Sequence, residues 1–151
     1  MKNGPDYNEI NSMLESLIEG VPYTMTNLAN ASALLNGKLH DINWVGFYTM
    51  KEGRLVLGPF QGKVACTIIP LGKGVCGTAA AQDRTLLVDN VHEFSGHIAC
   101  DSASNSEIVV PIHRSGAVFG VLDIDSPLFS RFTEEDREGL EEFVRILEKH
   151  I

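Results

Sequence analysis

The chain has 151 residues, 44% of them hydrophobic and 21% charged, and a net charge of −8 from 12 basic and 20 acidic residues. This length fits one domain with a single core. The acidic excess argues against nucleic acid or an anionic membrane as a partner, because phosphate binding depends on clustered Lys and Arg. No segment approaches the roughly 18 consecutive apolar residues of a membrane span, and the first residues lack the apolar core of a secretion signal. We therefore expect a cytoplasmic protein.

The first part of the chain predicts two helices. Apolar residues at helical spacing indicate an amphipathic helix over residues 7–19. Gly20 interrupts it, and Pro22 can start a second helix that ends near Gly37. A helical region of this length is compatible with a homodimer.

The pattern then changes to the alternation of strands. Residues 43–50 and 54–60 predict a hairpin, and residues 65–71 predict a third strand. Small residues over 74–81 favour a short, closely packed helix, and residues 85–88 predict a short strand.

Residues 89–105 show no periodicity and predict a long loop, of a length that is usually functional or disordered. Strands are expected at 106–113 and 117–125, joined by residues 114–116. The chain ends with a helix that Thr133 caps, with Glu134, Glu135 and Asp136 in its first turn and an apolar stripe at Leu140, Phe143, Val144 and Leu147. Together these elements predict an α+β domain: a central antiparallel sheet with the N-terminal and C-terminal helices packed on one face.

The last hairpin carries an informative group of acids. With a three-residue turn, His113 faces Ala117, Glu107 lies directly opposite Asp123, and Asp125 follows on the same face. At about 4 Å and an effective dielectric constant near 20, two ionised carboxylates would repel by about 4 kcal/mol. A cation would therefore lie among them, or one of them would keep a proton. The alternative is a solvated strand end whose acids point to water.

Three cysteines remain to be explained. Cys100 lies in a loop of small polar residues, which is unusual for a thiol that only fills a core, so we expect it to have a chemical role. Cys66 lies in a strand-like stretch and Cys76 in the small-residue helix, and either could be a buried apolar residue. A zinc site from the cysteines and His97 is weakly supported, because no pair has the short spacing of structural zinc ligands.

Gly72, Gly74 and Gly77 form a literal G-x-G-x-x-G pattern between a strand and a helix. We interpret it as a false dinucleotide fingerprint, because the helix is too short for a standard crossover and the strands that follow form hairpins. The glycines would instead allow the helix to approach the sheet closely.

Several stretches of the sequence resemble the free methionine-(R)-sulfoxide reductases, a family built on a GAF domain. They are Asn43-Trp-Val-Gly-Phe-Tyr48, Gly58-Pro-Phe-Gln-Gly62, Gly72-Lys-Gly-Val-Cys-Gly77, Gly96-His-Ile-Ala-Cys-Asp-Ser-Ala-Ser-Asn-Ser-Glu107 and Val121-Leu-Asp-Ile-Asp-Ser-Pro127, together with Cys66. The resemblance covers nearly the whole chain and implies one GAF-like catalytic domain over residues 1–151.

By this resemblance Cys100 is the catalytic nucleophile, Cys66 the resolving thiol and Cys76 an auxiliary cysteine. The substrate-binding residues implied are Glu107, Asp123, Asp125, Trp44 and Tyr48. The expected activity is reduction of free L-methionine-(R)-sulfoxide through a sulfenic acid and a disulfide, recycled by thioredoxin, with no metal and no organic cofactor. The alternative is a GAF module that senses a small ligand without turnover.

Overall fold

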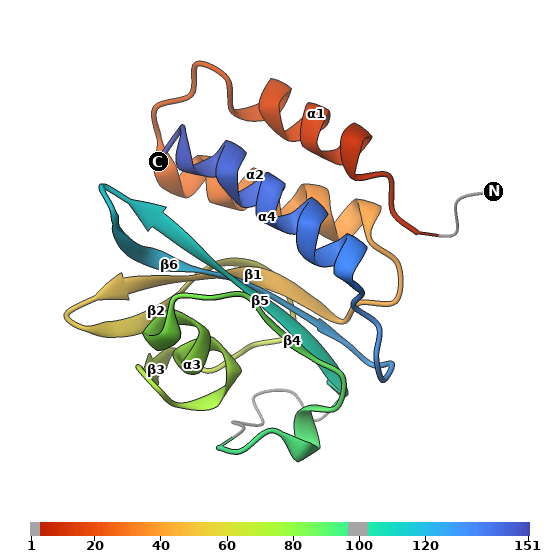
Figure 1. Cartoon of the computed structure of the whole chain (residues 1–151). Helices are drawn as coiled ribbons and strands as arrows, with labels where there is room; N and C mark the ends of the chain where they lie inside the picture. Colours follow the sequence, from red (N-terminus) through yellow and green to blue (C-terminus); the bar gives the residue numbers. More distant parts are fainter. Residues whose placement is uncertain (1–3, 97–102) are drawn as a thin grey trace.

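The computed structural model describes residues 4–96 and 103–151. A six-stranded antiparallel sheet with the order β3-β2-β1-β6-β5-β4 forms its middle layer. Helices α2 and α4 cover one face of the sheet and α1 packs outside them, while α3 lies against the other face (Figure 1). The elements are α1 (Tyr7–Ile18), α2 (Thr24–Lys38), β1 (Trp44–Lys51), β2 (Arg54–Gly62), β3 (Ile68–Pro70), α3 (Gly74–Gln82), β4 (Leu86–Val88), η1 (Val91–Glu93), β5 (Ser106–Arg114), β6 (Ala117–Ser126) and α4 (Glu134–Glu148).

Side chains cap the first and last helices, whereas the second begins at Thr24 rather than at the predicted Pro22 and continues past Gly37 to Lys38. Asp6 caps α1 by accepting a hydrogen bond from the backbone N–H of Glu9. Thr133 and Asp136 form a reciprocal capping box at the start of α4. The expected apolar stripe of α4 is buried. These observations confirm the predicted α+β class, with the N-terminal and C-terminal helices on one face of the sheet.

The turn of the last hairpin is tighter than predicted. It contains two residues, Ser115 and Gly116, and both have positive φ angles, as two-residue turns with the twist of a hairpin require. Arg114, rather than His113, therefore pairs with Ala117. An irregularity between Ile112 and His113 then shifts the pairing by one further residue.

The predicted pairing of the acids was wrong for the same reason. Glu107 pairs with Asp125, and Asp123 pairs with Val109. The total shift is two residues, and a shift of two keeps every side chain on its original face. The three carboxylates consequently share one face of the sheet, as expected.

The strand expected at 65–71 is also shorter than predicted, because only Ile68–Pro70 pairs with β2. The expected loop 89–105 contains the short helix η1 and leads into β5. Within residues 4–96 and 103–151, no helix is both long and apolar enough to cross a membrane.

The glycine pattern between β3 and α3 has structural causes. Gly72 and Gly74 have φ angles of +81° and +63°, which favour glycine. A Cβ at Gly77 would overlap the carbonyl oxygen of Pro70, so only glycine lets α3 lie this close to β3. Because β3 and β4 lie at opposite edges of an antiparallel sheet, no parallel βαβ unit exists here. The interpretation as a false fingerprint is confirmed.

Candidate functional site

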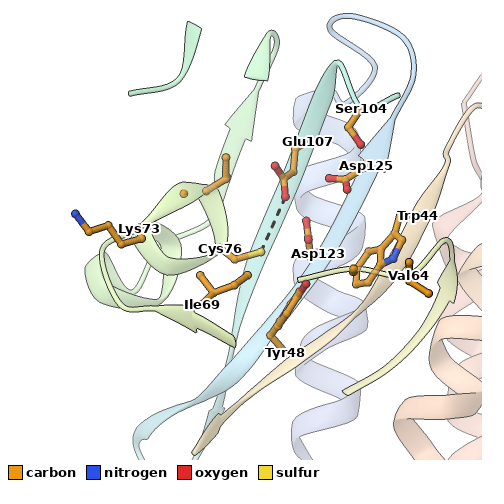
Figure 2. Close-up of a pocket in the computed structure, with 13 residues that line it drawn as sticks. Trp44, Tyr48, Val64, Ile69, Lys73, Cys76, Ser104, Glu107, Asp123 and Asp125 are labelled. Carbon is orange, nitrogen blue, oxygen red and sulfur yellow. Dashed lines mark hydrogen bonds between the residues drawn. The ribbon is translucent and has the colours of Figure 1, made fainter. Parts of the chain in front are cut away.

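The site lies on the face of the sheet that α3 covers. Antiparallel pairing places Trp44 beside Asp125 and Asp125 beside Glu107, which forms one row across three strands. The next row on the same face contains Gly46 and Asp123. Period-two alternation thus brings residues far apart in the sequence onto one surface. Figure 2 shows the side chains of Trp44, Glu107, Asp123 and Asp125 directed toward a common space.

Gly46 shapes the aromatic wall of this space. A Cβ at Gly46 would overlap Phe60 and approach the Trp44 ring to 2.8 Å. Without that Cβ, the Trp44 ring stacks on Phe60 at a centroid distance of 5.3 Å and on Tyr48 at 6.0 Å. The indole N–H donates to the carbonyl oxygen of Lys63 at 3.1 Å, which leaves an apolar ring surface for a ligand.

The pocket between this wall and α3 is lined by residues from four parts of the chain. They are Trp44 and Tyr48 of β1, Val64, Ala65, Ile69 and Lys73 from the segment around β3, Gly74, Val75 and Cys76 of α3, and Ser104, Glu107, Asp123 and Asp125 around the β5–β6 pair. All five predicted substrate-binding residues and Cys76 therefore line one pocket.

The acids of the pocket are not solvated strand-end residues. Glu107 is 7% exposed and Asp123 is 5% exposed, so the alternative of acids that point to water was wrong. Glu107 pairs directly with Asp125 across the two strands, and Asp123 lies on the same face. Like charges this close and this buried favour a proton within the cluster.

Electrostatics favour Glu107 as the group that keeps a proton. Burial raises the pKa of its carboxyl group well above 4.5, and the nearby charges of Asp123 and Asp125 raise it further. Burial also raises the pKa of the Tyr48 hydroxyl, which donates a 2.9 Å hydrogen bond to the carbonyl oxygen of Cys66. The arrangement favours a neutral carboxylic acid next to negative charge.

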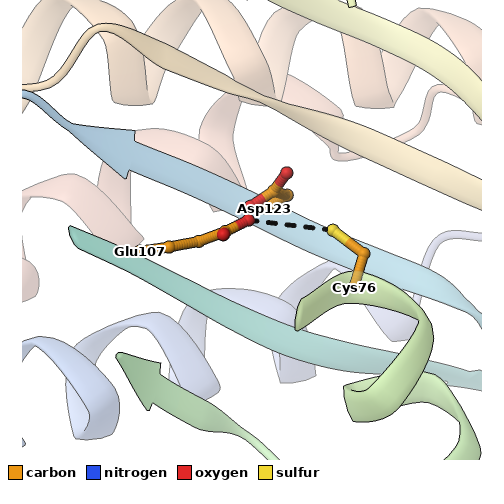
Figure 3. Close-up of side chains that lie close together, drawn as sticks. All are labelled: Cys76, Glu107 and Asp123. Atoms are coloured by element: carbon orange, nitrogen blue, oxygen red, sulfur yellow. Dashed lines mark hydrogen bonds between the residues drawn. The ribbon is translucent and has the colours of Figure 1, made fainter. Parts of the chain in front are cut away.

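Cys76 lies in the wall of the same pocket. It is the free cysteine among the described residues, is 4% exposed, and its Sγ lies 4.0 Å from Glu107 Oε2 (Figure 3). Burial raises the pKa of this thiol well above 9.0, and the negative charges of Asp123 and Glu107 add to the effect. Cys76 is therefore a neutral thiol here.

The same three side chains, Cys76, Glu107 and Asp123, lie close enough together to hold a metal ion. One ligand atom each from Cys76, Glu107 and Asp123 lies within 4.8 Å of the others. A soft divalent cation would need the thiolate and both carboxylates. Without a cation, burial and the neighbouring carboxylates raise the pKa values of Cys76 and Glu107 and favour their protonated forms.

The other two cysteines have different positions. Cys66 is disulfide-bonded and partly buried in the segment between β2 and β3. Cys100, the predicted nucleophile, lies outside the described residues, as does His97.

Two parts of the pocket were not predicted. Ser104 is 5% exposed, and its hydroxyl accepts a hydrogen bond from Asn43 Nδ2 at 3.1 Å. Ser104 lies inside the stretch 96–107 that resembles the reductase family, but its residue type did not indicate a place in the pocket. The first turn of α3 also lines the pocket, and no side chain caps its N-terminus. Only the packing of α3 across the sheet reveals this contribution.

Comparison with protein families assigns the architecture. The GAF domain model matches residues 13–151, so the protein is a GAF domain. This agrees with the sheet and helix arrangement described above.

Individual relatives define the group more narrowly. The free methionine-R-sulfoxide reductase of Escherichia coli is 53% identical over 143 residues, which cover 95% of this chain and 87% of that protein. The fRMsr of Staphylococcus aureus in its reduced form is 51% identical, with a TM-score of 0.96 over 99% of both chains. Its complex with substrate gives a TM-score of 0.94 over 99% of this chain and 98% of that chain. The chain belongs to the free methionine-R-sulfoxide reductase family of GAF-domain proteins.

Proposed function

We propose that this protein reduces free L-methionine-(R)-sulfoxide to L-methionine, with residues 1–151 acting as one catalytic domain. The observation that carries the proposal is the pocket in which a buried carboxyl with a raised pKa, two further acids and two aromatic rings face one another. The 53% identity to an E. coli protein named for this activity supports the same substrate.

The pocket offers a separate partner for each group of a free amino acid. Asp123 and Asp125 bind the ammonium, a charge that a methionine inside a peptide lacks. The Trp44 ring contacts the S-methyl group. The first-turn N–H groups of Val75 and Cys76 have no partner within α3 and bind the α-carboxylate at the positive end of the helix.

Oxygen transfer needs a proton donor and a nucleophile. The Cys100 thiolate attacks the sulfoxide sulfur, and the neutral Glu107 carboxyl gives its proton to the sulfoxide oxygen. The sulfur–oxygen bond breaks and the hydroxyl passes to the Cys100 sulfur as the bond between the two sulfurs breaks. Methionine leaves with its sulfur reduced by two electrons, and Cys100 becomes a sulfenic acid, oxidised by two electrons. The Glu107 carboxylate then recovers a proton from water.

The cycle closes by disulfide exchange. The Cys66 thiol condenses with the sulfenic acid, which releases water and forms a disulfide, and the disulfide-bonded state of Cys66 supports this role. A dithiol protein such as thioredoxin reduces the disulfide and is itself oxidised. Thiols supply every electron, so the cycle uses no metal and no organic cofactor. A thioredoxin-dependent cycle fits the reducing cytoplasm.

A homodimer through the N-terminal helices remains part of the proposal. Helix α1 exposes 37% of Met13 and 41% of Leu17 on its outer side. Sedimentation of the purified chain at several concentrations tests it: a constant monomer mass would contradict this point alone.

Substrate specificity is tested with four substrates: each sulfoxide epimer, as the free amino acid and inside a peptide. With dithiothreitol as reductant, we expect methionine only from the free R epimer. Binding of that epimer without turnover would instead support a GAF sensor module. Equal rates on the peptide would contradict the role of Asp123 and Asp125 in binding the ammonium.

The roles of the thiols are tested by two substitutions. Cys100→Ser should abolish methionine formation with any reductant, and unchanged turnover would remove the nucleophile assignment. Cys66→Ser should release one methionine per chain at the normal rate but recycle poorly with thioredoxin. Normal steady-state rates in Cys66→Ser would show that another group resolves the sulfenic acid.

A further inference from the structure

The thiol of Cys76 has no role in the cycle above, in which only the backbone N–H of this residue contacts the substrate. The sequence resemblance implied an auxiliary cysteine, that is, a thiol available for exchange. The geometry points to a different role, which rests on the proposed function. We propose that Cys76 is a positioning residue, a permanently neutral thiol that donates its hydrogen to Glu107 Oε2 and orients that carboxyl toward the substrate.

The position of the sulfur carries this inference. Cys76 is directed into the pocket from the first turn of α3, and its Sγ lies 4.0 Å from Glu107 Oε2 (Figure 3). A thiol hydrogen that points at Oε2 favours the acid proton on the other oxygen, Oε1. The thiol thus selects which oxygen of Glu107 is the acid.

The surroundings of Cys76 also oppose thiol exchange. It is 4% exposed, and the groups near its sulfur are the carboxyls of Glu107 and Asp123. A thiolate there would add a negative charge to a cluster that already retains a proton to avoid one. Exchange proceeds through the thiolate, so this environment keeps the thiol unreactive.

The glycine pattern explains how the thiol reaches this position. Gly77 follows Cys76, and the absence of a Cβ there lets α3 approach the Pro70 carbonyl oxygen. Gly74 begins α3 with a positive φ of 63°, and its N–H donates to the Gly96 carbonyl oxygen at 3.1 Å. These contacts seat the first turn of α3 over the acids.

The test compares Cys76→Ala, which removes the donor, with Cys76→Ser, which replaces it by a hydroxyl. In a single turnover with free methionine-(R)-sulfoxide, we expect Cys76→Ala to form methionine about tenfold more slowly, the effect of losing one hydrogen bond to a functional group. Cys76→Ser should recover most of that loss. Thr78→Ala, on the same helix but outside the pocket, serves as the control and should match the wild type.

Three further readouts separate positioning from redox chemistry. The alkaline limb of the pH–rate profile should move upward in Cys76→Ala, because the lost donor stabilised ionised Glu107. Titration after one turnover should show that two thiols disappear per chain in both the wild type and Cys76→Ala. The ratio of the thioredoxin-dependent steady-state rate to the single-turnover rate should be the same in Cys76→Ala as in the wild type.

A measurement without turnover makes the result independent of the proposed function. The infrared band of the protonated carboxyl in the ligand-free protein should shift in Cys76→Ala and not in Thr78→Ala. An unmoved band would overturn the inference, as would a normal single turnover with lost thioredoxin recycling, which would mark Cys76 as an exchanging thiol. Absence of turnover in the wild type would instead refute the proposed function.

Discussion

The two faces of one sheet differ sharply in chemistry although the same strands build them. The face under α2 and α4 is aliphatic, with Ile108, Val110, Leu122 and Ile124 fully or nearly fully buried. The opposite face of the same strands carries Val109 and Val121 but also Glu107 and Asp123, both buried. The first face stabilises the fold, and the second places acids where they oppose folding. One hairpin builds both faces because alternate side chains of a strand point to opposite sides of the sheet.

The largest expected effect comes from the aliphatic face. Phe143 of α4 is fully buried in that core, so Phe143→Ala should lower the free energy of unfolding by about 3–5 kcal/mol. The rate per folded molecule should change little, because Phe143 is not among the residues that line the pocket. Urea unfolding measures the first quantity and turnover at low temperature the second. Glu142→Ala, on the exposed side of α4, should stay within about 0.5 kcal/mol of the wild type.

A substitution on the acidic face should change the free energy of unfolding in the opposite direction. Glu107→Gln removes a buried acid whose folded-state pKa lies above 4.5, so the ligand-free protein should gain on the order of 1 kcal/mol at neutral pH. The folded state of the wild type binds a proton that the unfolded state releases above about pH 4.5. Wild-type stability should therefore fall as pH rises from there toward the folded-state pKa, and the gap to the variant should widen.

The same variant should lose function. Removal of the proton donor should lower the rate by about 100-fold or more and raise KM for the sulfoxide. Thermal unfolding across pH, with Glu138→Gln on the exposed side of α4 as control, checks the stability. A Glu107→Gln variant that is less stable than the wild type at neutral pH would contradict the view that this face opposes folding.

The smallest effect is expected at a contact that links the two faces. His113, near the end of β5, bonds Asp83 after α3 at 2.6 Å and Glu148 of α4 at 3.2 Å. Burial alone lowers the pKa of its imidazole, but the hydrogen bonds to the two acids outweigh it, so the pKa lies above 6.5. The stabilisation of the folded state by protonated His113 is complete below about pH 6.5. It is lost as pH rises through the raised pKa of the imidazole.

His113→Gln should therefore destabilise the protein at pH 6 and much less at pH 9. The difference should be under about 1 kcal/mol, because the imidazole is 41% exposed and water screens the pairs. Thermal unfolding at both pH values measures it, with His40→Gln as the matched control. An equal loss at both pH values would show that His113 acts by packing rather than by charge.

Part of the site was predictable because it depends on short-range periodicity. The alternation of residues 106–125 places Glu107, Asp123 and Asp125 on one face of the sheet. A shift of the strand pairing by two residues does not change that face. The exact partners were not predictable. The two-residue turn at Ser115–Gly116 and the irregularity beside His113 depend on backbone conformations that a residue pattern does not specify.

The sequence by itself determined the α+β class, the start of the last helix at Thr133, and the family, because capping, periodicity and motifs are local properties. Only the tertiary structure decided that Glu107 is buried beside two further acids, that Gly46 leaves space for the Trp44 ring, and that Cys76 faces the acids. These features depend on how α3 and β1 pack against β5 and β6, and burial, which sets the pKa of a carboxyl group, exists only after that packing.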